Sequence, residues 1–312
     1  MNEFEIISLL TRGLAGNESV RVGPGDDCAV LDLGVPGHWV LFKTDAVVEG
    51  IHFTSETAPG RIGHKALARC LSDFAAMAGS PTAVVVTLAM PQSHDVKFIE
   101  AIYAGMNQLA RRHHVAIVGG ETTTNPERLL LSLAVVGTVP RQRCVLRSGS
   151  KPGDAIFVTG TLGGSICGKH LDFQPRIEEG CWLAEHFNIH AMIDLSDGLA
   201  GDLRHLLDAA NVGADLLQDA IPVSREAKLQ ARENRSNKAP LAAAMSDGED
   251  FELLFTLASR DAVALHDAWR KRFPELPLTC IGKVTAEPGL RLRSRKGIQP
   301  VTEHGYVHFA KP

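Results

Sequence analysis

Residues 61–79, RIGHKALARCLSDFAAMAG, set the pattern of the first half of the chain. Four apolar side chains recur at spacings of four, three and four, which places them on one helix face: Leu67, Leu71, Phe74 and Ala78. Gly79-Ser80-Pro81 ends the predicted helix, because glycine and proline are common just beyond a helix C-terminus. Asp73 lies inside this predominantly apolar segment, so the sequence predicts an amphipathic helix that carries one acid.

Short β-rich segments surround this helix. Turns rich in Gly, Pro and Asp separate them, and the pattern predicts strands over residues 29–33, 39–44, 83–89, 115–118 and 129–139. A second periodic segment predicts a helix over residues 94–114. The first half is therefore expected to be a mixed α/β domain.

The turn-rich sequence RSGSKPGD at residues 147–154 separates this half from a second one. Beyond it we expect strands over residues 155–159, 251–257, 278–284 and 290–293, and helices over residues 176–187, 199–210 and 261–273. A length of 312 residues also favours two domains. We expect an α/β (α+β) protein with mixed sheets and with domains at residues 1–147 and 148–312.

The composition excludes several classes of function. With 45% hydrophobic and 22% charged residues, the chain is typical of folded globular proteins. Lys and Arg number 32 against 36 Asp and Glu, so no general positive field exists to attract nucleic acid or an anionic membrane. No apolar run approaches the roughly 18 residues of a membrane span, and the acidic amino terminus is unlike a secretory signal. Six cysteines without a Cys-x-x-Cys pair are typical of reduced thiols, so we expect a cytoplasmic protein.

Acidic residues gather where predicted elements begin or end, and one group lies within the predicted helix. The groups occupy residues 25–27, 44–45, 72–73, 119–122, 194–198 and 246–250. Any one of them is more often a turn or helix-cap group, and Asp73 has an alternative partner in Arg69, one helical turn away. Converging carboxylates repel one another unless cations lie between them, and Mg²⁺ prefers such oxygen ligands beside phosphates. Together the groups predict one shared Mg²⁺ site.

Two glycine-rich segments raise the question of a phosphate loop. The segment GGSICGK, residues 163–169, has the spacing of a Walker A loop, but position 170 is His where that loop requires Ser or Thr. It therefore predicts a packed helix start instead. Gly119 and Gly120 form either a tight turn or a place where the backbone approaches phosphate closely, and the sequence leaves both interpretations open.

Nine motifs, in order from about residue 23 to residue 309, resemble the thiamine-monophosphate kinase family: GDDCAV, TDAVVEGIHF, KALARCLSDFAAMAGSP, GGETT, RSGSKPGD, VTGTLG, IDLSDGL, GEDFELLF and GYVHF. The resemblance implies a two-domain fold like that of aminoimidazole ribonucleotide synthetase, with ATP, Mg²⁺ and dimerisation assigned to the N-terminal domain and with N-terminal sheets that pair across a homodimer. It also implies direct transfer of the γ-phosphoryl group of ATP to thiamine monophosphate, assisted by several Mg²⁺ ions, to give thiamine diphosphate. Such a transfer depends on positioning and charge neutralisation more than on a side-chain base.

The resemblance further implies roles for single residues. The implied Mg²⁺ ligands, which include the catalytic residues Asp45 and Asp73, are Asp27, Thr44, Asp45, Asp73, Glu121, Asp194 and Asp197. The implied ATP contacts are Tyr103, Gly120, Glu121, Arg147 and Ser196. The implied contacts of thiamine monophosphate are His52, Glu249 and Tyr306, with the tyrosine against the heterocycle and Glu249 facing its cationic or amino side.

Four features depart from the family pattern. Glu121 stands where Asp is usual, and Lys43 replaces the small or hydroxyl residue that commonly precedes Thr44-Asp45. Asp247 occupies a usual glycine position, and the stretch between residues 168 and 176 is shorter than in typical members. Two other hypotheses stay open: another ATPase of the superfamily that activates an amide or formyl oxygen, or a nucleotide-binding homologue with weak catalysis. The terminal GYVHF argues against the first of these.

Overall fold

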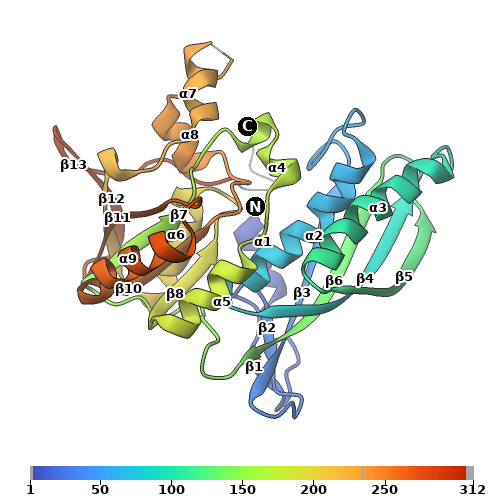
Figure 1. Cartoon of the computed structure of the whole chain (residues 1–312), viewed down its shortest axis with the longest axis horizontal. Helices are drawn as coiled ribbons and strands as arrows, with labels where there is room; N and C mark the ends of the chain where they lie inside the picture. The colour runs from blue at the N-terminus through green and yellow to red at the C-terminus, as the bar shows by residue number, and fades with distance from the viewer. Residues whose placement is uncertain (1–2, 234, 307–312) are drawn as a thin grey trace.

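The computed structural model describes residues 3–233 and 235–306, and each half of the chain contributes one β-sheet. Figure 1 shows the two sheets on either side of helix α2 (Pro59–Ala76). No helix in the described ranges is long and apolar enough to cross a membrane. Both sheets contain parallel as well as antiparallel pairs, so the predicted α/β fold with mixed sheets is confirmed.

Six strands and two long helices form the body of the N-terminal half. The elements besides α2 are α1 (Glu3–Leu10), β1 (Val20–Val22), β2 (Ala29–Leu31), β3 (His38–Val48), β4 (Ser80–Met90), α3 (Val96–Arg112), β5 (Ala116–Thr124) and β6 (Leu130–Pro140). The sheet order is β1-β2-β3-β6-β4-β5, and only β4 and β5 pair in parallel. The core lies between one face of this sheet and the helices α2 and α3.

Glycines allow α2 and α3 to pack with their backbones in contact. A Cβ on Gly63 would lie 1.9 Å from the carbonyl oxygen of Ile102, and a Cβ on Gly105 would lie 1.9 Å from that of Gly60. Any side chain at these positions would force the helices apart. The close crossing fixes α2, and with it the orientation of Asp73.

The C-terminal half contains the second sheet, with helices on both faces. Its elements are β7 (Asp154–Thr159), η1 (Ser165–Cys167), α4 (Lys169–Asp172), α5 (Ile177–His186), β8 (Ile189–Asp194), α6 (Leu199–Ala210), β9 (Gly213–Leu217), η2 (Gln218–Ala220), α7 (Arg225–Arg232), α8 (Pro240–Ser246), β10 (Leu253–Ala258), η3 (Ser259–Asp261), α9 (Ala262–Arg272), β11 (Leu278–Thr285), β12 (Gly289–Ser294) and β13 (Gly297–Pro300). The strand order is β13-β12-β9-β11-β7-β10-β8. Side chains of β7 alternate between two cores: Ile156 and Val158 share one with α6 and α8, and Phe157 shares the other with α5 and α9.

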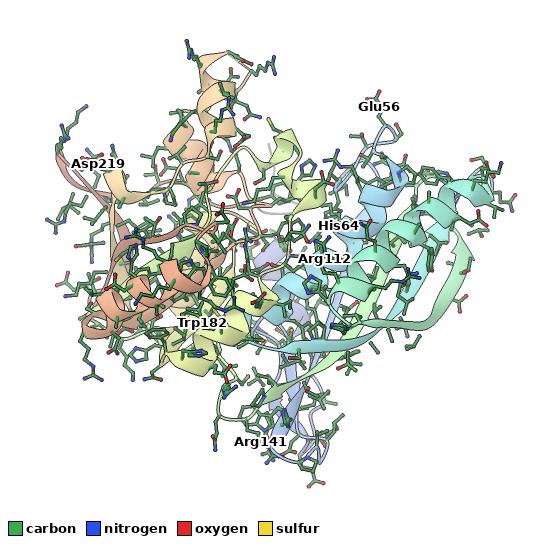
Figure 2. The ribbon with its side chains drawn as sticks, in the orientation of Figure 1. Glu56, His64, Arg112, Arg141, Trp182 and Asp219 are labelled. Atoms are coloured by element: carbon green, nitrogen blue, oxygen red, sulfur yellow. The ribbon has the colours of Figure 1, made fainter. Side chains whose placement is uncertain are left out.

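Helix α2 belongs to both halves. Its C-terminal turn packs directly on α5, where a Cβ on Gly180 would lie 2.1 Å from the carbonyl oxygen of Ala75. Nearer its N-terminus, the Nε2 of His64 lies 2.7 Å from the carbonyl oxygen of Phe173, just beyond α4. Figure 2 labels His64 on this helix. The two halves are therefore held together along the length of α2.

Most predicted elements are confirmed with boundaries that differ by a few residues, but two motifs are placed wrongly. The Thr44-Asp45 pair lies inside β3 rather than at its end. Residues 119–122 lie inside β5 rather than in a turn after a strand. There Gly120 pairs with Val86, and a Cβ on Gly120 would lie 1.8 Å from the carbonyl oxygen of Val86. The glycine therefore permits a close approach of two strands.

The chain passes from the first sheet to the second between residues 140 and 154. The boundary that we propose, at residues 147 and 148, lies within this connection. The motif GYVHF extends to residue 309, and its last three residues lie outside the described ranges.

Candidate active site

Three buried carboxylates from distant parts of the chain meet between the two sheets. Asp27 comes from the turn between β1 and β2, Asp73 from α2, and Asp194 from the C-terminal end of β8. One oxygen of each lies within 4.8 Å of the others. We call Asp27, Asp73 and Asp194 the acidic cluster. The structure thus brings together three residues that the resemblance implies as Mg²⁺ ligands.

Lys43 connects the acidic cluster to Asp45. Both residues lie on β3, two positions apart, so their side chains share the inner face of the sheet. The Lys43 Nζ is 2.8 Å from the Oδ1 of Asp73 and 3.9 Å from the Oδ1 of Asp45. Asp73 therefore pairs with Lys43, whereas the sequence left Arg69 open as its partner. Burial alone would lower the pKa of Lys43, yet Asp73 and Asp45 raise it well above its ordinary value.

Asp27 and Asp194 have partners of their own. Arg147 donates to Asp27 over 2.6 Å, and the Ser72 hydroxyl donates to Asp194 over 2.6 Å. The Oδ2 of Asp27 and the Nε of Arg147 are buried and have no hydrogen-bond partner among the described residues. Such unsatisfied groups are uncommon in folded proteins and often mark a place that a ligand completes.

Negative charge is in excess at this site. Burial, and after it the charge of Asp27, raises the pKa of Asp194 to about 7. Burial also raises the pKa of Asp73 well above its ordinary value, against the opposing charge of Lys43. A raised carboxyl pKa means that the charged form lacks enough positive partners. The donors are all carboxylate oxygens and one is unpaired, so the acidic cluster fits a hard divalent cation such as Mg²⁺.

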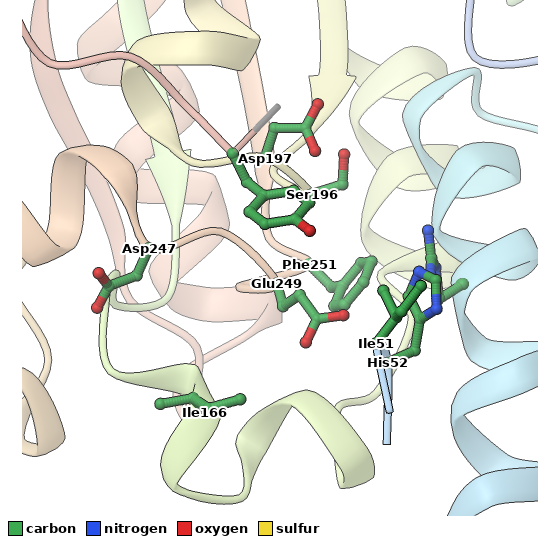
Figure 3. A pocket seen from close by; sticks show the side chains of 10 residues that line it. Ile51, His52, Ile166, Ser196, Asp197, Asp247, Glu249 and Phe251 are labelled. Atoms are coloured by element: carbon green, nitrogen blue, oxygen red, sulfur yellow. The ribbon is translucent and has the colours of Figure 1, made fainter. Parts of the chain in front are cut away.

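A cavity of about 180 Å³ lies between the two halves of the chain, and residues of both halves line it. Its lining includes five residues that the sequence singles out: His52, Ser196, Asp197, Glu249 and Tyr306. Ser196 and Asp197 lie two and three residues beyond the end of β8, which places the cavity next to Asp194. Figure 3 shows the Glu249 side chain in this pocket, between Ile166 and His52. The predicted substrate contacts are therefore brought together.

Glu249 is held by a lysine that sequence reasoning missed. Lys65 on α2 is 1% exposed, and its Nζ lies 2.7 Å from Glu249 Oε1 and 2.8 Å from Oε2. The same Nζ donates to the carbonyl oxygen of His52 over 2.7 Å. Lys65 thus links two walls of the cavity that belong to different halves of the chain. Its burial has no signal in the sequence, because a lysine on a helix is usually solvated.

The loop between α8 and β10 has an unusual backbone. Glu249 has a φ of 54° and Phe251 a φ of 49°, a region that residues other than glycine rarely adopt. The Phe251 ring stacks on Phe173, with 3.9 Å between the ring centroids. Strained residues of this kind persist only where their surroundings hold them, and they cluster at functional sites.

Four implied site residues lie away from the acidic cluster. Thr44 alternates with its neighbours along β3, so its exposed side chain is on the opposite face of the sheet from Asp45. Gly120 and Glu121 lie on the edge strand β5, three strand spacings or about 14 Å from β3. Tyr103 lies on α3 and lines a separate hollow. Within one chain, these four residues are therefore separate from the acidic cluster and from the cavity.

Asp197 belongs to a further group with Asp202 and His205. Ligand atoms of these three residues lie within 4.8 Å of one another. The backbone N–H groups of Asp197 and Gly198 both donate to the Oδ2 of Asp202 over 3.0 Å. Asp202 thereby satisfies backbone donors at the start of α6, which is an ordinary structural role for an acid.

A second set of buried charges lies nearby, and we call it the Glu252 network. Glu252 is 1% exposed and accepts hydrogen bonds of 2.8 Å from Lys169, Arg176 and Thr159. Burial alone would raise the pKa of Glu252, but Lys169 and Arg176 lower it. Lys169 is the last residue of the segment that resembles a Walker A loop. Lys169 is the first residue of α4, and its ammonium group neutralises the Glu252 carboxylate. The prediction of a packed helix start is therefore confirmed.

Comparison with known proteins agrees with this architecture. Two family models match: the N-terminal domain of AIR synthase related protein over residues 25–139, and its C-terminal domain over residues 151–295. The thiamine-monophosphate kinase of Rhodopirellula baltica is 39% identical over 93% of this chain and 92% of its own length, and that of Escherichia coli K12 is 35% identical over 99% of both. A solved structure described as AaThiL complexed with AMPPCP and TMP has a TM-score of 0.83 at 28% identity, covering 99% of this chain and 97% of the other. The chain therefore belongs to the thiamine-monophosphate kinase family, within the AIR synthase related proteins.

Proposed function

We propose that this protein transfers the γ-phosphoryl group of ATP to thiamine monophosphate and releases thiamine diphosphate and ADP. The observation that carries the proposal is the acidic cluster, which lies next to a cavity lined by His52, Glu249 and Tyr306. Close relatives are named for this activity, and the similar solved structure is described with AMPPCP and TMP. Both reactants are anions, so the site has to position them while it neutralises their charge.

Asp27, Asp45, Asp73 and Asp194 would hold Mg²⁺ in this site, with Thr44, Glu121 and Asp197 as further proposed ligands. Asp45 and Asp73 would act as the catalytic carboxylates. When bound, the metal neutralises and aligns phosphate oxygens. The buried, unpaired oxygen of Asp27 supports this role, as does the pKa of Asp194, which burial and the nearby charge of Asp27 raise to about 7, because a bound cation would satisfy the oxygen and offset both effects.

Residues around the cavity would orient the two substrates. The unpaired Nε of Arg147 is a buried donor that suits a phosphate oxygen, and Ser196, which lines the cavity, would supply a hydroxyl for the nucleotide. The Glu249 carboxylate would face the cationic ring of thiamine monophosphate, with Tyr306 against the heterocycle and His52 on the opposite wall.

We also propose that the open face of the first sheet pairs with a second copy of the chain. Within the part of the chain that the structure describes, α2 and α3 cover one face of this sheet, and the other face presents exposed apolar side chains: Phe42, Val85, Val118 and Val136. Exposed apolar patches of this kind mark protein interfaces. Gly120, Glu121 and Tyr103 would then contact the nucleotide in the site of the second copy. Val85→Glu is expected to give a monomer by light scattering and to lose activity; a Val85→Glu protein that stays dimeric would reject this face.

The cysteines support a cytoplasmic location, which we propose on that basis. All six are free thiols. Burial raises the pKa of Cys28 and Cys70 well above the ordinary value, which keeps them protonated and unreactive. Free thiols are typical of reducing compartments.

A product assay tests the function directly. Purified protein is incubated with ATP, MgCl₂ and thiamine monophosphate, and both ADP and thiamine diphosphate are measured by chromatography. The two products should appear in equal amounts, and replacing thiamine monophosphate with thiamine, which has no acceptor phosphate, should stop the reaction. Release of ADP without thiamine diphosphate would reject the substrate.

A further inference from the structure

Lys43 is the cation closest to Asp73 and Asp45. Its Nζ lies 2.8 Å from Asp73 Oδ1 and 3.9 Å from Asp45 Oδ1, so the ammonium group occupies the space between the two carboxylates. The side chain is held on the inner face of β3, with 22% of its surface exposed. It enters the site from a central part of the sheet, since β3 pairs with β2 on one side and with β6 on the other.

A metal ion and this ammonium group compete for the same place. Mg²⁺ binds at about 2.1 Å from each ligand oxygen, with near-octahedral geometry. An ion shared by Asp45 and Asp73 would therefore lie close to the position of the Lys43 Nζ, and two cations at such a distance repel each other strongly. Asp27 and Asp194 do not pair with Lys43, because Arg147 is the partner of Asp27 and Ser72 is the partner of Asp194.

We propose that Lys43 is a built-in cation of the site, which takes the place of one metal ion between Asp45 and Asp73 and leaves the remaining carboxylate oxygens to bind Mg²⁺. This inference rests on the proposed function for the identity of the metal, but it concerns a residue of this chain. It has two consequences. The protein binds one Mg²⁺ fewer than a variant with a small residue at position 43, and it keeps its acidic cluster stable without metal.

The first consequence is tested by counting bound metal. Wild-type protein, Lys43→Ser and Lys43→Met are titrated with MgCl₂ by calorimetry, alone and with saturating AMPPCP. Lys43→Ser, which offers a small hydroxyl group, is expected to bind one more Mg²⁺ per chain than the wild type. Lys97→Met, which removes an exposed positive charge on α3, is the matched control and should bind the same number as the wild type. Equal numbers in Lys43→Ser and wild type would overturn the proposal, because Mg²⁺ would then simply displace the lysine.

The second consequence is tested without metal. In EDTA, Lys43→Met is expected to lower the Tm by about 5 °C or more, because it leaves Asp73 buried without its partner. MgCl₂ should raise the Tm of Lys43→Met more than that of the wild type. The double variant Lys43→Met/Asp73→Asn removes both charges and should recover most of the loss, which also covers the case in which the single variant does not fold. An unchanged Tm of Lys43→Met in EDTA would contradict the role of Lys43.

The two proposals fail in distinguishable ways. An active wild-type enzyme with equal Mg²⁺ counts in all variants rejects the role of Lys43 and leaves the proposed function intact. A wild-type protein that makes no thiamine diphosphate, yet shows the extra Mg²⁺ in Lys43→Ser and the instability of Lys43→Met in EDTA, rejects the substrate and supports Lys43.

Discussion

The acidic cluster and the Glu252 network both lie near the contact between the two halves of the chain, but their buried carboxylates have opposite pKa shifts. In the network, two cations and a hydroxyl group surround one carboxylate, and the pKa of Glu252 is lowered. In the acidic cluster, the pKa of Asp194 is raised to about 7 and one oxygen of Asp27 has no partner among the described residues. Burial is common to both. The balance of charge separates a group that holds the fold from groups arranged to hold a ligand.

The sharpest way to test this contrast is Asp194→Asn. We expect turnover to fall by about 10³-fold, because a ligand for the metal and a charge near the reacting phosphates are lost. The Tm in EDTA should stay equal or rise, since the variant removes a carboxylate whose charged form is poorly compensated and since an amide oxygen accepts from Ser72 equally well. Steady-state kinetics and thermal melts measure both effects. A large loss of Tm in EDTA would show that Asp194 is structural.

Glu252→Gln should give the opposite result. The loss of this carboxylate removes the counter-charge of Lys169 and leaves Arg176 with only the more distant Glu179, at 3.6 Å, so we expect the free energy of unfolding to fall by about 3 kcal/mol. Turnover per folded molecule should stay within about threefold of the wild type, because the side-chain partners of Glu252 within the described ranges, Thr159, Lys169 and Arg176, do not line the cavity. Urea unfolding and activity per active site are the measurements. A stable but inactive Glu252→Gln protein would contradict the structural role of Glu252 and would place it with the acidic cluster.

Lys65→Met tests a pair that lies between these extremes. Lys65 is buried, but Glu249 is 27% exposed and can be hydrated when the lysine is removed. We therefore expect a loss of stability of about 1 kcal/mol. The KM for thiamine monophosphate should rise about 10-fold, because Glu249 loses the group that fixes its position, whereas the KM for ATP should not change. Equal changes in both KM values would assign Lys65 a general structural role.

The pH dependence of stability should differ in sign between the two sets. Asp194 has a raised pKa in the folded protein, so its stabilising contribution is present at low pH and is lost as the pH rises through about 7. Glu252 has a lowered pKa, so its contribution is present above the ordinary value of 4.5 and is lost as the pH falls below it. Each slope is at most about 1.4 kcal/mol per pH unit. Thermal melts in EDTA at several pH values measure these slopes. Asp194→Asn should remove the fall in stability as the pH rises towards about 7, and Glu252→Gln should remove the fall in stability below pH 4.5.

The fold could be predicted to a large extent because its helices have clear periodicity. The apolar spacing predicts α2, and Asp73 stands out as an acid inside this predominantly apolar segment. Strands β8 and β9 are short and lie between helices, so no alternating pattern identifies them. The glycines of β5 look like a turn because their extended conformation depends on pairing with β4, a contact that local sequence does not encode.

The site was only partly accessible to sequence reasoning for a similar reason. Resemblance to a family named Asp27, Asp73 and Asp194, but their meeting within 4.8 Å depends on how two sheets pack on one helix. Lys65 escaped notice because nothing local distinguishes a buried lysine from a solvated one. Lys43 was noticed as a departure, yet only the structure shows its contact with Asp73.

The left-handed backbone at Glu249 and Phe251 has a consequence for protein engineering. Glycine adopts this conformation without strain. However, Glu249→Gly would leave the buried Lys65 without its carboxylate partner, and Phe251→Gly would remove a buried ring that stacks on Phe173, so both changes should lower stability. Directed evolution that screens only for survival at high temperature is therefore expected to keep Glu249 and Phe251 in spite of their backbone strain, and thermostable descendants should retain the acceptor pocket.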